Sequence, residues 1–433
     1  MNALNFYPPG RAAAALGAAL LSFVAQAEDI ARPPEFHRNI KPTIDHFDPI
    51  EVDPALNLAK VINLTLEKYP DSAWLAAQEA EAAAILERSK SWTSGAARAG
   101  LAYQEATSGT LHYIDAVVQV PLWNLGQRDA ERSLADRAQA DTESQSKAVH
   151  LRVAGLIRTA LWDMELQKVR HQQALAEVDT YGQLFDKIRR RVELGDLPEA
   201  DLLLAETELL QKRSALTLAE AEFMHARKRY ATITQTSRIP AEFNENLAEL
   251  GEIQKIHPAL AALDSQIERK KAQIEALRLT GSGQPDLMLG INSDRPSDND
   301  PRSNKTESFN IAVSVPFGGS AHLQPQIAAL QVEESRLLAD YQQLYRDLEL
   351  VHHEAEHNLE VNKAELKIAE EMRQVAEAHM RMIEISFSAG EIDLMDLLRV
   401  KARTQQAILN AKERSVILQR DIALYNQAVG VMP

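Results

Sequence analysis

The chain has 433 residues, a formal net charge of −15 and no cysteine. The lack of cysteine excludes disulfides, thiolate metal sites and a cysteine nucleophile. An acidic chain without basic clusters also argues against nucleic acid as a partner.

The first 27 residues have the features of a secretory signal peptide. Arg11 is the only charge before Glu28, residues 12–24 form an apolar run, and Ala-Gln-Ala at 25–27 is a small-x-small cleavage site. Cleavage there would leave 406 residues (433 − 27) with a net charge of −16, because Arg11 is removed. No later segment reaches about 18 consecutive apolar residues, so we expect an exported chain whose membrane crossing, if any, uses strands.

The rest of the chain contains the same pattern of residues twice, 195 positions apart (316 − 121 and 390 − 195). Pro121 and Gly195 of the first copy correspond to Pro316 and Gly390 of the second. Two copies this far apart indicate a duplication rather than a short-period solenoid. The sequence therefore predicts a signal peptide (1–27), an N-terminal extended segment (28–53), a first structural repeat (54–237), a linker (238–254) and a second structural repeat (255–433).

The first copy begins with an alanine- and glutamate-rich helix over residues 54–91, which Pro70 breaks early. Two short strands follow at 97–106 and 111–120, joined by a turn at 107–110. Apolar and mostly polar residues alternate along the second strand, which is the pattern of a half-buried strand. The alternating apolar residues are Ile114, Ala116, Val118 and Val120.

The second copy repeats the two strands more clearly, with a solvated loop predicted at 292–307. The alternating apolar residues are Leu287, Leu289 and Ile291 in one strand and Phe309, Ile311, Val313 and Val315 in the other. A soluble hairpin and a membrane-barrel strand share this alternation. The chain offers only four such strands, and open edges are not tolerated in lipid. Membrane crossing would therefore require several protomers to pool their strands, and three protomers would supply twelve (3 × 4).

Each strand pair is followed by roughly 70 residues with no internal proline apart from Pro325, which is about 100 Å of helix. The chain then turns near Gly195 and Gly390, and helices return over 199–235 and 394–429. Glycine suits a left-handed helix C-cap, and we expect Asp196 or Asp393 to cap the returning helix. In the second long helix the apolar residues step by four and three, as in a coiled-coil seam: Leu337, Tyr341, Leu344, Leu348, Val351, Ala355 and Leu359.

At this point the chain resembles the TolC family of outer-membrane efflux channels. Residues 120–128 (VPLWNLGQR) and 315–319 (VPFGG) are similar to the family's strand-to-helix junctions, and 387–398 (FSAGEIDLMDLL) is similar to its helical-hairpin tip. The junction residues are Pro121, Gly126, Pro316, Gly318 and Gly319. The resemblance extends from about residue 54 to residue 433, and the order, duplication and spacing of the motifs make it specific.

The resemblance implies a mainly α fold with a small membrane β part: long coiled-coil α-hairpins plus four strands per protomer. Three protomers would form a 12-stranded β-barrel and an α-helical tunnel. It further implies a passive exit duct in the bacterial outer membrane that extends into the periplasm. The implied partners are two further copies of the chain, a periplasmic adaptor protein, an inner-membrane efflux pump and outer-membrane lipid. Neither enzymatic activity nor a cofactor is implied.

The resemblance also suggests functional residues at the two hairpin tips. The expected adaptor-docking residues are Gly195, Asp196 and Leu197 in the first copy and Gly390, Glu391 and Ile392 in the second. Asp396 stands where relatives place an acidic residue around the tunnel constriction. Arg399 stands where they can carry a second acid, so a two-layer acidic gate is not expected. The alternative is that Asp396 is a solvated acid favoured by the dipole at a helix N-terminus.

Two other functions fit parts of the sequence. His353 and His357 complete an HExxH motif, the signature of zinc peptidases, but we expect them on a solvated stripe of a long helix and assign no metal. A periplasmic coiled-coil adaptor also has long helical hairpins, but it would lack the duplicated strand pairs. The substrate stays open between metal ions, small toxic compounds and secreted protein. The general character of the chain is nearest to the heavy-metal efflux branch.

Overall fold

The computed structural model describes residues 50–105, 107, 111–296 and 305–433. All of them belong to one compact unit, residues 44–433. Several predicted segments lie outside the described residues. These are the signal peptide, most of the N-terminal extended segment, most of the turn at 107–110 and the middle of the 292–307 loop.

Helices make up most of the described chain. Helix α1 (Leu58–Lys68) and helix α2 (Asp71–Lys90) are separated at Pro70, where the sequence predicts a break. The remaining helices are α3 (Gln127–Glu193), α4 (Glu199–Thr234), α5 (Pro258–Leu279), α6 (Gln324–Ser388) and α7 (Leu394–Ala428). A 3₁₀ turn, η1 (Ser320–His322), precedes α6, and Pro325 falls in the first turn of that helix, where a missing N–H costs nothing. Within the described residues, no helix combines the length and apolarity that crossing a bilayer demands.

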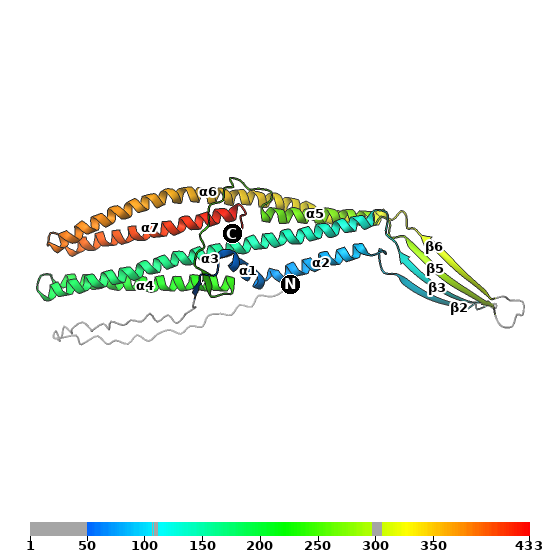
Figure 1. Cartoon of the computed structure of the whole chain (residues 1–433), viewed down its shortest axis with the longest axis horizontal. Coiled ribbons are helices and arrows are strands. Elements are labelled where there is room, and N and C mark those ends of the chain that lie inside the picture. Colours follow the sequence, from blue (N-terminus) through cyan, green and yellow to red (C-terminus); the bar gives the residue numbers. More distant parts are fainter. Residues whose placement is uncertain (1–49, 106, 108–110, 297–304) are drawn as a thin grey trace, which may run out of the picture. The chain divides into compact units, whose positions relative to one another are not determined.

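The two predicted strand pairs form one antiparallel sheet. Its strands are β2 (Arg98–Glu105), β3 (Leu111–Pro121), β5 (Asp286–Pro296) and β6 (Thr306–Ser314), in that order across the sheet. Strand β3 of the first copy pairs with β5 of the second along its whole length. The duplicated halves are therefore joined edge to edge, and β2 and β6 are left as the two edges (Figure 1).

The register of the sheet places the alternating side chains of neighbouring strands on two different faces. Val118 lies opposite Leu289, and Leu289 lies opposite Ile311, so apolar side chains align across three strands. One position along, Val117 lies opposite Gly290, which lies opposite Asn310. Successive side chains of a strand point to opposite faces. One face is therefore apolar and the other carries smaller and polar groups, as the alternation predicted.

A second, two-stranded sheet was not predicted. Strand β1 (Glu51–Asp53) pairs in parallel with β4 (Arg238–Pro240), which falls in the segment predicted as a linker. The structure thus adds two short strands to the four alternating strands that the sequence predicts. The added strands are three residues long and lie far apart in sequence, so neither carries an alternation of its own.

The helices follow the same order as the strands. Helices α2 and α4 pack on α3, α3 also packs on α5 and α7, and α6 packs on α5 and α7 (Figure 1). The first copy thus supplies one edge of the helical layer through α2 and α4, and the second copy supplies the other edge through α6. Each edge of the layer belongs to the same copy as the strand edge beside it.

The main core lies where the middle of α3 meets α1 and α4. Val153, Ile157 and Leu161 of α3 are fully buried there, against Ile62 and Tyr230. Burial raises the pKa of Tyr230 to about 12, partly offset by a hydrogen bond with Thr234, and its hydroxyl donates to the backbone oxygen of Arg238 (2.8 Å).

The predicted seam of α6 holds except near its centre. Leu348 and Ala355 are half-buried and Leu359 is buried, but Val351 is 48% exposed. The neighbouring His352 is buried instead, with its Nε2 3.4 Å from the hydroxyl of Tyr425 in α7. A four-residue step from Leu348 places His352 on the packed face, because a 3.6-residue repeat drifts against a 3.5-residue one.

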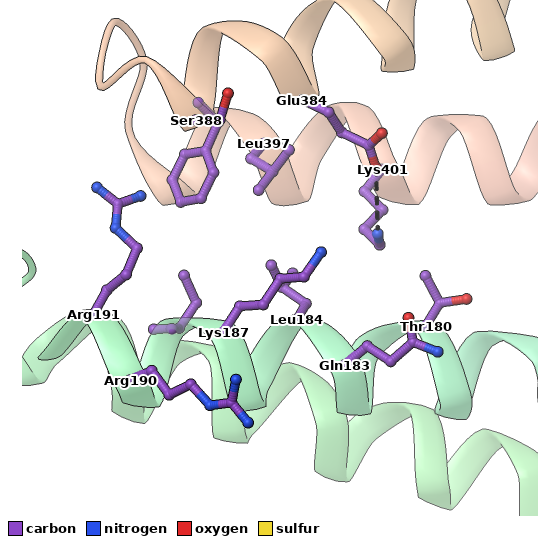
Figure 2. Close-up of a pocket in the computed structure, with 12 residues that line it drawn as sticks. Thr180, Gln183, Leu184, Lys187, Arg190, Arg191, Glu384, Ser388, Leu397 and Lys401 are labelled. Carbon is purple, nitrogen blue, oxygen red and sulfur yellow. Dashed lines mark ion pairs between the residues drawn. The ribbon is translucent and has the colours of Figure 1, made fainter. Parts of the chain in front are cut away.

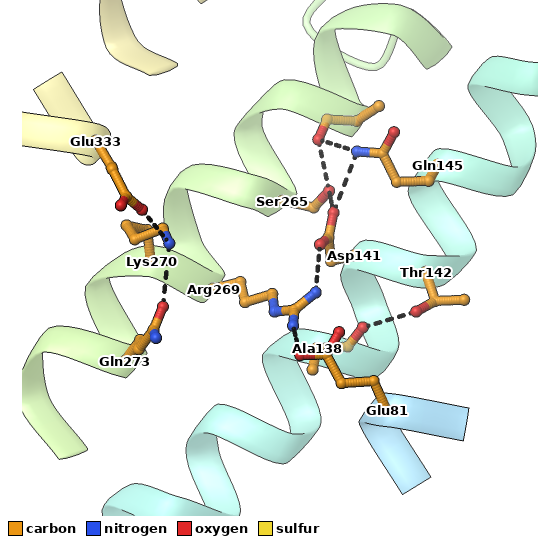
Figure 3. A network of polar contacts seen from close by, with 11 residues as sticks. Glu81, Ala138, Asp141, Thr142, Gln145, Ser265, Arg269, Lys270, Gln273 and Glu333 are labelled. Carbon is orange, nitrogen blue, oxygen red and sulfur yellow. Dashed lines mark hydrogen bonds and ion pairs between the residues drawn. The ribbon is translucent and has the colours of Figure 1, made fainter. Parts of the chain in front are cut away.

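A polar network ties together the helices nearest the sheet (Figure 3). The buried carboxylate of Asp141 in α3 accepts hydrogen bonds from Ser265 (3.1 Å), Gln145 (3.2 Å) and Arg269 (3.3 Å). Arg269 in α5 also donates to Glu81 of α2 (2.7 Å). The next residue of α5, Lys270, donates to Glu333 of α6 (2.7 Å). These bonds connect α2, α3, α5 and α6 in the order in which they pack.

Candidate functional site: the hairpin tips

The two hairpin tips have the same backbone design. Gly195 has φ 82° and Gly390 has φ 76°, as the predicted left-handed caps require. The N–H of Gly195 donates to the oxygen of Val192 (2.9 Å), and that of Asp196 to the oxygen of Arg191 (2.8 Å). Gly390 and Glu391 make the corresponding bonds. Both long helices thus end in a Schellman motif.

The returning helices begin differently in the two copies. Asp393 caps α7, accepting a hydrogen bond from the N–H of Asp396 (2.8 Å), as predicted. Asp196 does not cap α4: the cap position is Pro198, with no side-chain hydrogen bond. The prediction for Asp196 was wrong because the 195-residue offset places Pro198, not Asp196, opposite Asp393.

Asp396 and Arg399 are one helical turn apart at the start of α7. Their side chains are 53% and 60% exposed and form an ion pair of 3.4 Å. An exposed pair of this kind contributes little to stability, in the range of about 0–1 kcal/mol. Both groups therefore face solvent in a single chain and are free to meet other molecules.

The two tips are packed against each other by an apolar cluster. Leu184 and Ile188 of α3 contact residues of α7 including Leu394 and Leu397. Of the predicted docking residues, Leu197 packs partly against this cluster, whereas Gly195, Asp196, Gly390 and Glu391 are exposed and Ile392 is half-buried. The cluster gives the exposed tip loops a rigid base.

A basic cavity of about 590 Å³ opens between the two hairpins just behind the tips (Figure 2). Four cationic side chains, Lys187, Arg190, Arg191 and Lys401, line it together with one carboxylate, Glu384. Net positive charge here contrasts with the net charge of −15 of the chain. The cavity therefore favours an anionic group.

Lys401 is the buried member of this set, only 8% exposed. Its Nζ lies 4.0 Å from Glu384 and 5.9 Å from the ring centre of Tyr181. Burial lowers the pKa of Lys401, Glu384 opposes the shift and Lys187 adds to it. The sequence analysis does not identify Lys401. This lysine continues the buried stripe of α7 formed by Leu394, Leu397 and Leu398. A charged residue on such an apolar stripe is a signal by which the site could be found.

The predicted strand-to-helix junctions are also structured alike. Pro121 ends β3, and Gly126 (φ 79°) precedes α3. In the second copy, Pro316 follows β6, Gly318 has φ 75°, and the N–H of Gly319 donates to Ser282 (2.9 Å). Each junction thus uses a proline to end pairing and a glycine to redirect the chain into its long helix.

No protein-family model matches the chain, and no curated protein sequence matches it. Solved structures do match. CusC, a protein that forms a transmembrane channel, gives a TM-score of 0.67 at 12% identity over 92% of this chain and 99% of that one. The outer membrane protein VceC from Vibrio cholerae gives 0.67 at 13% identity, covering 86% and 96%. The outer-membrane channel OprN gives 0.65 at 16% identity, covering 89% and 95%. These matches confirm the predicted fold of the single chain, which is mainly helical with a small sheet.

Proposed function

We propose that the chain is an outer-membrane exit duct of the TolC family, a passive channel in a tripartite efflux system. One observation carries the proposal. A four-stranded sheet with one apolar face continues into helical hairpins whose longer arms have 67 and 65 residues. A periplasmic adaptor would need no such sheet. The similarity to outer-membrane channels over most of both chains supports the same function.

The edges of the sheet favour a trimer. Strands β2 and β6 each have one side that no other strand of the described residues pairs with. In hydrocarbon every unpaired backbone group would cost several kcal/mol, so the edges must be joined to other copies. Three copies would close twelve strands (3 × 4) into a barrel, above the minimum of about eight.

Two exposed apolar stripes on the helices support the same assembly. On α6, Val361, Ile368, Val375 and Met382 recur every seven residues and are 43–70% exposed. On α4, Leu203, Leu210 and Leu218 are 58%, 43% and 67% exposed. Because α4 belongs to one edge of the layer and α6 to the other, each stripe needs a second copy of the chain to cover it.

The two stripes match in register when the tips of neighbouring copies are level. Helix α4 leads away from its tip starting at residue 199, and α6 leads towards its tip and ends at residue 388. Residues of the two helices that lie side by side then have numbers that add up to 587. Leu203 would face position 384, Leu210 position 377 and Leu218 position 369 (587 minus each number). Each of these positions lies within about two residues of a stripe residue on α6, which is within one helical turn.

We propose that the tips dock a periplasmic adaptor and that the basic cavity receives its carboxylates. Among the described residues, neither Lys187 nor Arg190 forms an ion pair, so both have charge available for a partner. The exposed loops at Gly195–Leu197 and Gly390–Ile392 flank the cavity and supply the remaining contact surface. Asp396 would line the constriction of the assembled tunnel and favour cations there.

Two measurements on the purified chain test the function. Mass determination in mild detergent should find three chains, and insertion into a planar lipid bilayer should produce ion conductance. Asp396→Ala should lower the cation preference of that conductance. Asp201→Ala is the matched control, because Asp201 is the equivalent residue of the first copy (396 − 195). A helical monomer that produces no conductance would overturn the proposal, and equal effects of the two substitutions would remove Asp396 from the constriction.

A further inference from the structure

The two histidines of the HExxH motif lie close together on the surface of α6. His353 and His357 are both exposed, with ring centres 6.5 Å apart and ring planes 25° from parallel. Among the described residues, neither ring takes part in a hydrogen bond or ion pair. Two imidazoles with free nitrogen atoms are therefore held side by side by the helix.

The pair lies outside the face of α6 that packs against α7. His352 and Leu359 face α7 and are buried, while the stripe that includes Val361 faces the other way. At 100° per residue, His353 lies between these two faces, and His357 lies beside the stripe, four residues before Val361. Packing against α7 therefore needs neither ring, and both rings are accessible in the single chain.

The spacing of the rings is close to that of a metal chelate. Zn–N bonds of about 2.1 Å place a metal ion about 3.2 Å from each ring centre. At a tetrahedral angle the two ring centres would then be about 5 Å apart, roughly 1.5 Å closer than in the free side chains. Exposed side chains change rotamer readily, so this approach requires no movement of the backbone.

The surrounding charge favours a cation. Glu349, Glu356 and Glu360 are exposed on the same side of α6, one turn or less from the two histidines. The described residues hold no group of three or more His, Cys, Asp or Glu side chains already placed to surround a metal ion. The arrangement is thus an open two-imidazole site, which differs from the three-ligand centre of a zinc peptidase.

We propose that His353 and His357 bind one divalent transition-metal ion of borderline softness, such as Cu²⁺, Zn²⁺ or Ni²⁺, with water completing the coordination. Imidazole suits these ions, and i, i+4 placement brings two of them to one helical face. Only the neutral rings can coordinate, so binding weakens as the solution is acidified. The site is open to solvent on one side and exchanges its ion readily. This inference does not depend on the proposed channel function.

The test is a titration of the purified full chain, without a histidine tag, with Cu²⁺ alone. Electron paramagnetic resonance should show two nitrogen ligands on the first equivalent per chain. His353→Ala and His357→Ala should each leave one nitrogen ligand and weaken binding by at least about tenfold. His379→Ala is the matched control, because His379 is also exposed on α6 but has valine and isoleucine four residues away on either side.

The outcomes are distinct. Loss of binding in the two single variants, with His379→Ala unchanged, supports the site. Unchanged binding in either single variant overturns it, as does loss in the control. Alanine is the best helix former, so the variants should keep the helicity of the parent chain, and circular dichroism checks this.

Discussion

Arg158 donates two hydrogen bonds to Glu245, from Nε at 2.8 Å and from Nη2 at 2.5 Å, with none of its side chain exposed. The same guanidinium donates to the Gln427 side chain (2.7 Å) and to the backbone oxygen of Val431 (3.1 Å). One residue of α3 therefore holds the segment between the two copies and the segment after α7 in place.

Removing this arginine should destabilise the fold severely. Arg158→Met leaves the Glu245 carboxylate buried without its partner, which costs about 3–5 kcal/mol. The double variant Arg158→Met/Glu245→Leu should recover most of that loss, since both charges are then gone. Thermal unfolding followed by circular dichroism measures the difference. Arg229→Met, which breaks the exposed ion pair with Asp163, is the control and should cost no more than about 1 kcal/mol.

The sheet should present one face to lipid and the other to water. The chain has no cysteine, so single cysteines can be placed without background. Those at Ile311 and Val313 should resist a membrane-impermeant thiol reagent, because these side chains lie on the apolar face. Those at Asn310 and Ser314, on the other face, should be labelled. Equal labelling at all four positions in the membrane-inserted protein would refute the orientation.

Gly390→Val should impair the tip without unfolding the protein. A β-branched residue at φ 76° is strained by roughly 1–3 kcal/mol, although no atom within 4 Å would obstruct its Cβ. We expect weaker efflux in cells and an intact purified trimer. Gly182→Ala is the control, because this glycine lies inside α3 and lacks a positive φ. A Cβ added there would meet no other side chain or distant backbone atom within 4 Å, so alanine should stabilise the fold by about 0.5–1 kcal/mol. Efflux that is unchanged in Gly390→Val would show that the tip conformation is not needed.

Lys401→Met should separate stability from partner binding. Burial lowers the pKa of Lys401, so the unfolded chain holds this proton more tightly than the folded one. Stability should therefore rise with pH from the lowered pKa towards the ordinary lysine value, and the substitution should abolish this slope. At neutral pH methionine should stabilise by roughly 0.5–2 kcal/mol.

The same substitution removes a cation from the basic cavity. It should therefore weaken binding of the adaptor, measured by surface plasmon resonance on the purified trimer. Arg399→Met is a useful comparison, because it removes a charge outside the cavity. If Lys401→Met binds the adaptor as well as the parent chain does, the cavity is not part of the docking surface.

The sequence predicts the large elements because their signals are local. Proline breaks, glycine caps and two-residue or seven-residue repeats all act within a few residues, and the junction prolines and tip glycines recur 195 positions along the chain. Proline 70, Gly195 and Gly390 therefore mark the ends of helices in the structure where the sequence places them.

The features that the sequence did not reveal depend on distant contacts. Val52 pairs with Ile239 although 187 residues separate them, and three-residue strands have no periodicity to detect. The burial of His352 in place of Val351 depends on Tyr425 of another helix. The basic cavity needs side chains from both copies, Lys187 from one and Lys401 from the other, so neither copy read alone contains it.

The matching order of strands and helices has a consequence for symmetry. Within one chain, β3 meets β5 and α3 meets α5 and α7, across the boundary between the two copies. In the proposed trimer, β6 of one chain would meet β2 of the next, and α6 would meet α2 and α4. The ring would then consist of six similar units, which are the two copies in each of three chains. Neighbouring units would be joined alternately by the linker within a chain and by pairing of strands and helices between chains. A chain cut within 238–254 should therefore reassemble from its two halves, since the linker joins units that side-by-side pairing already brings together.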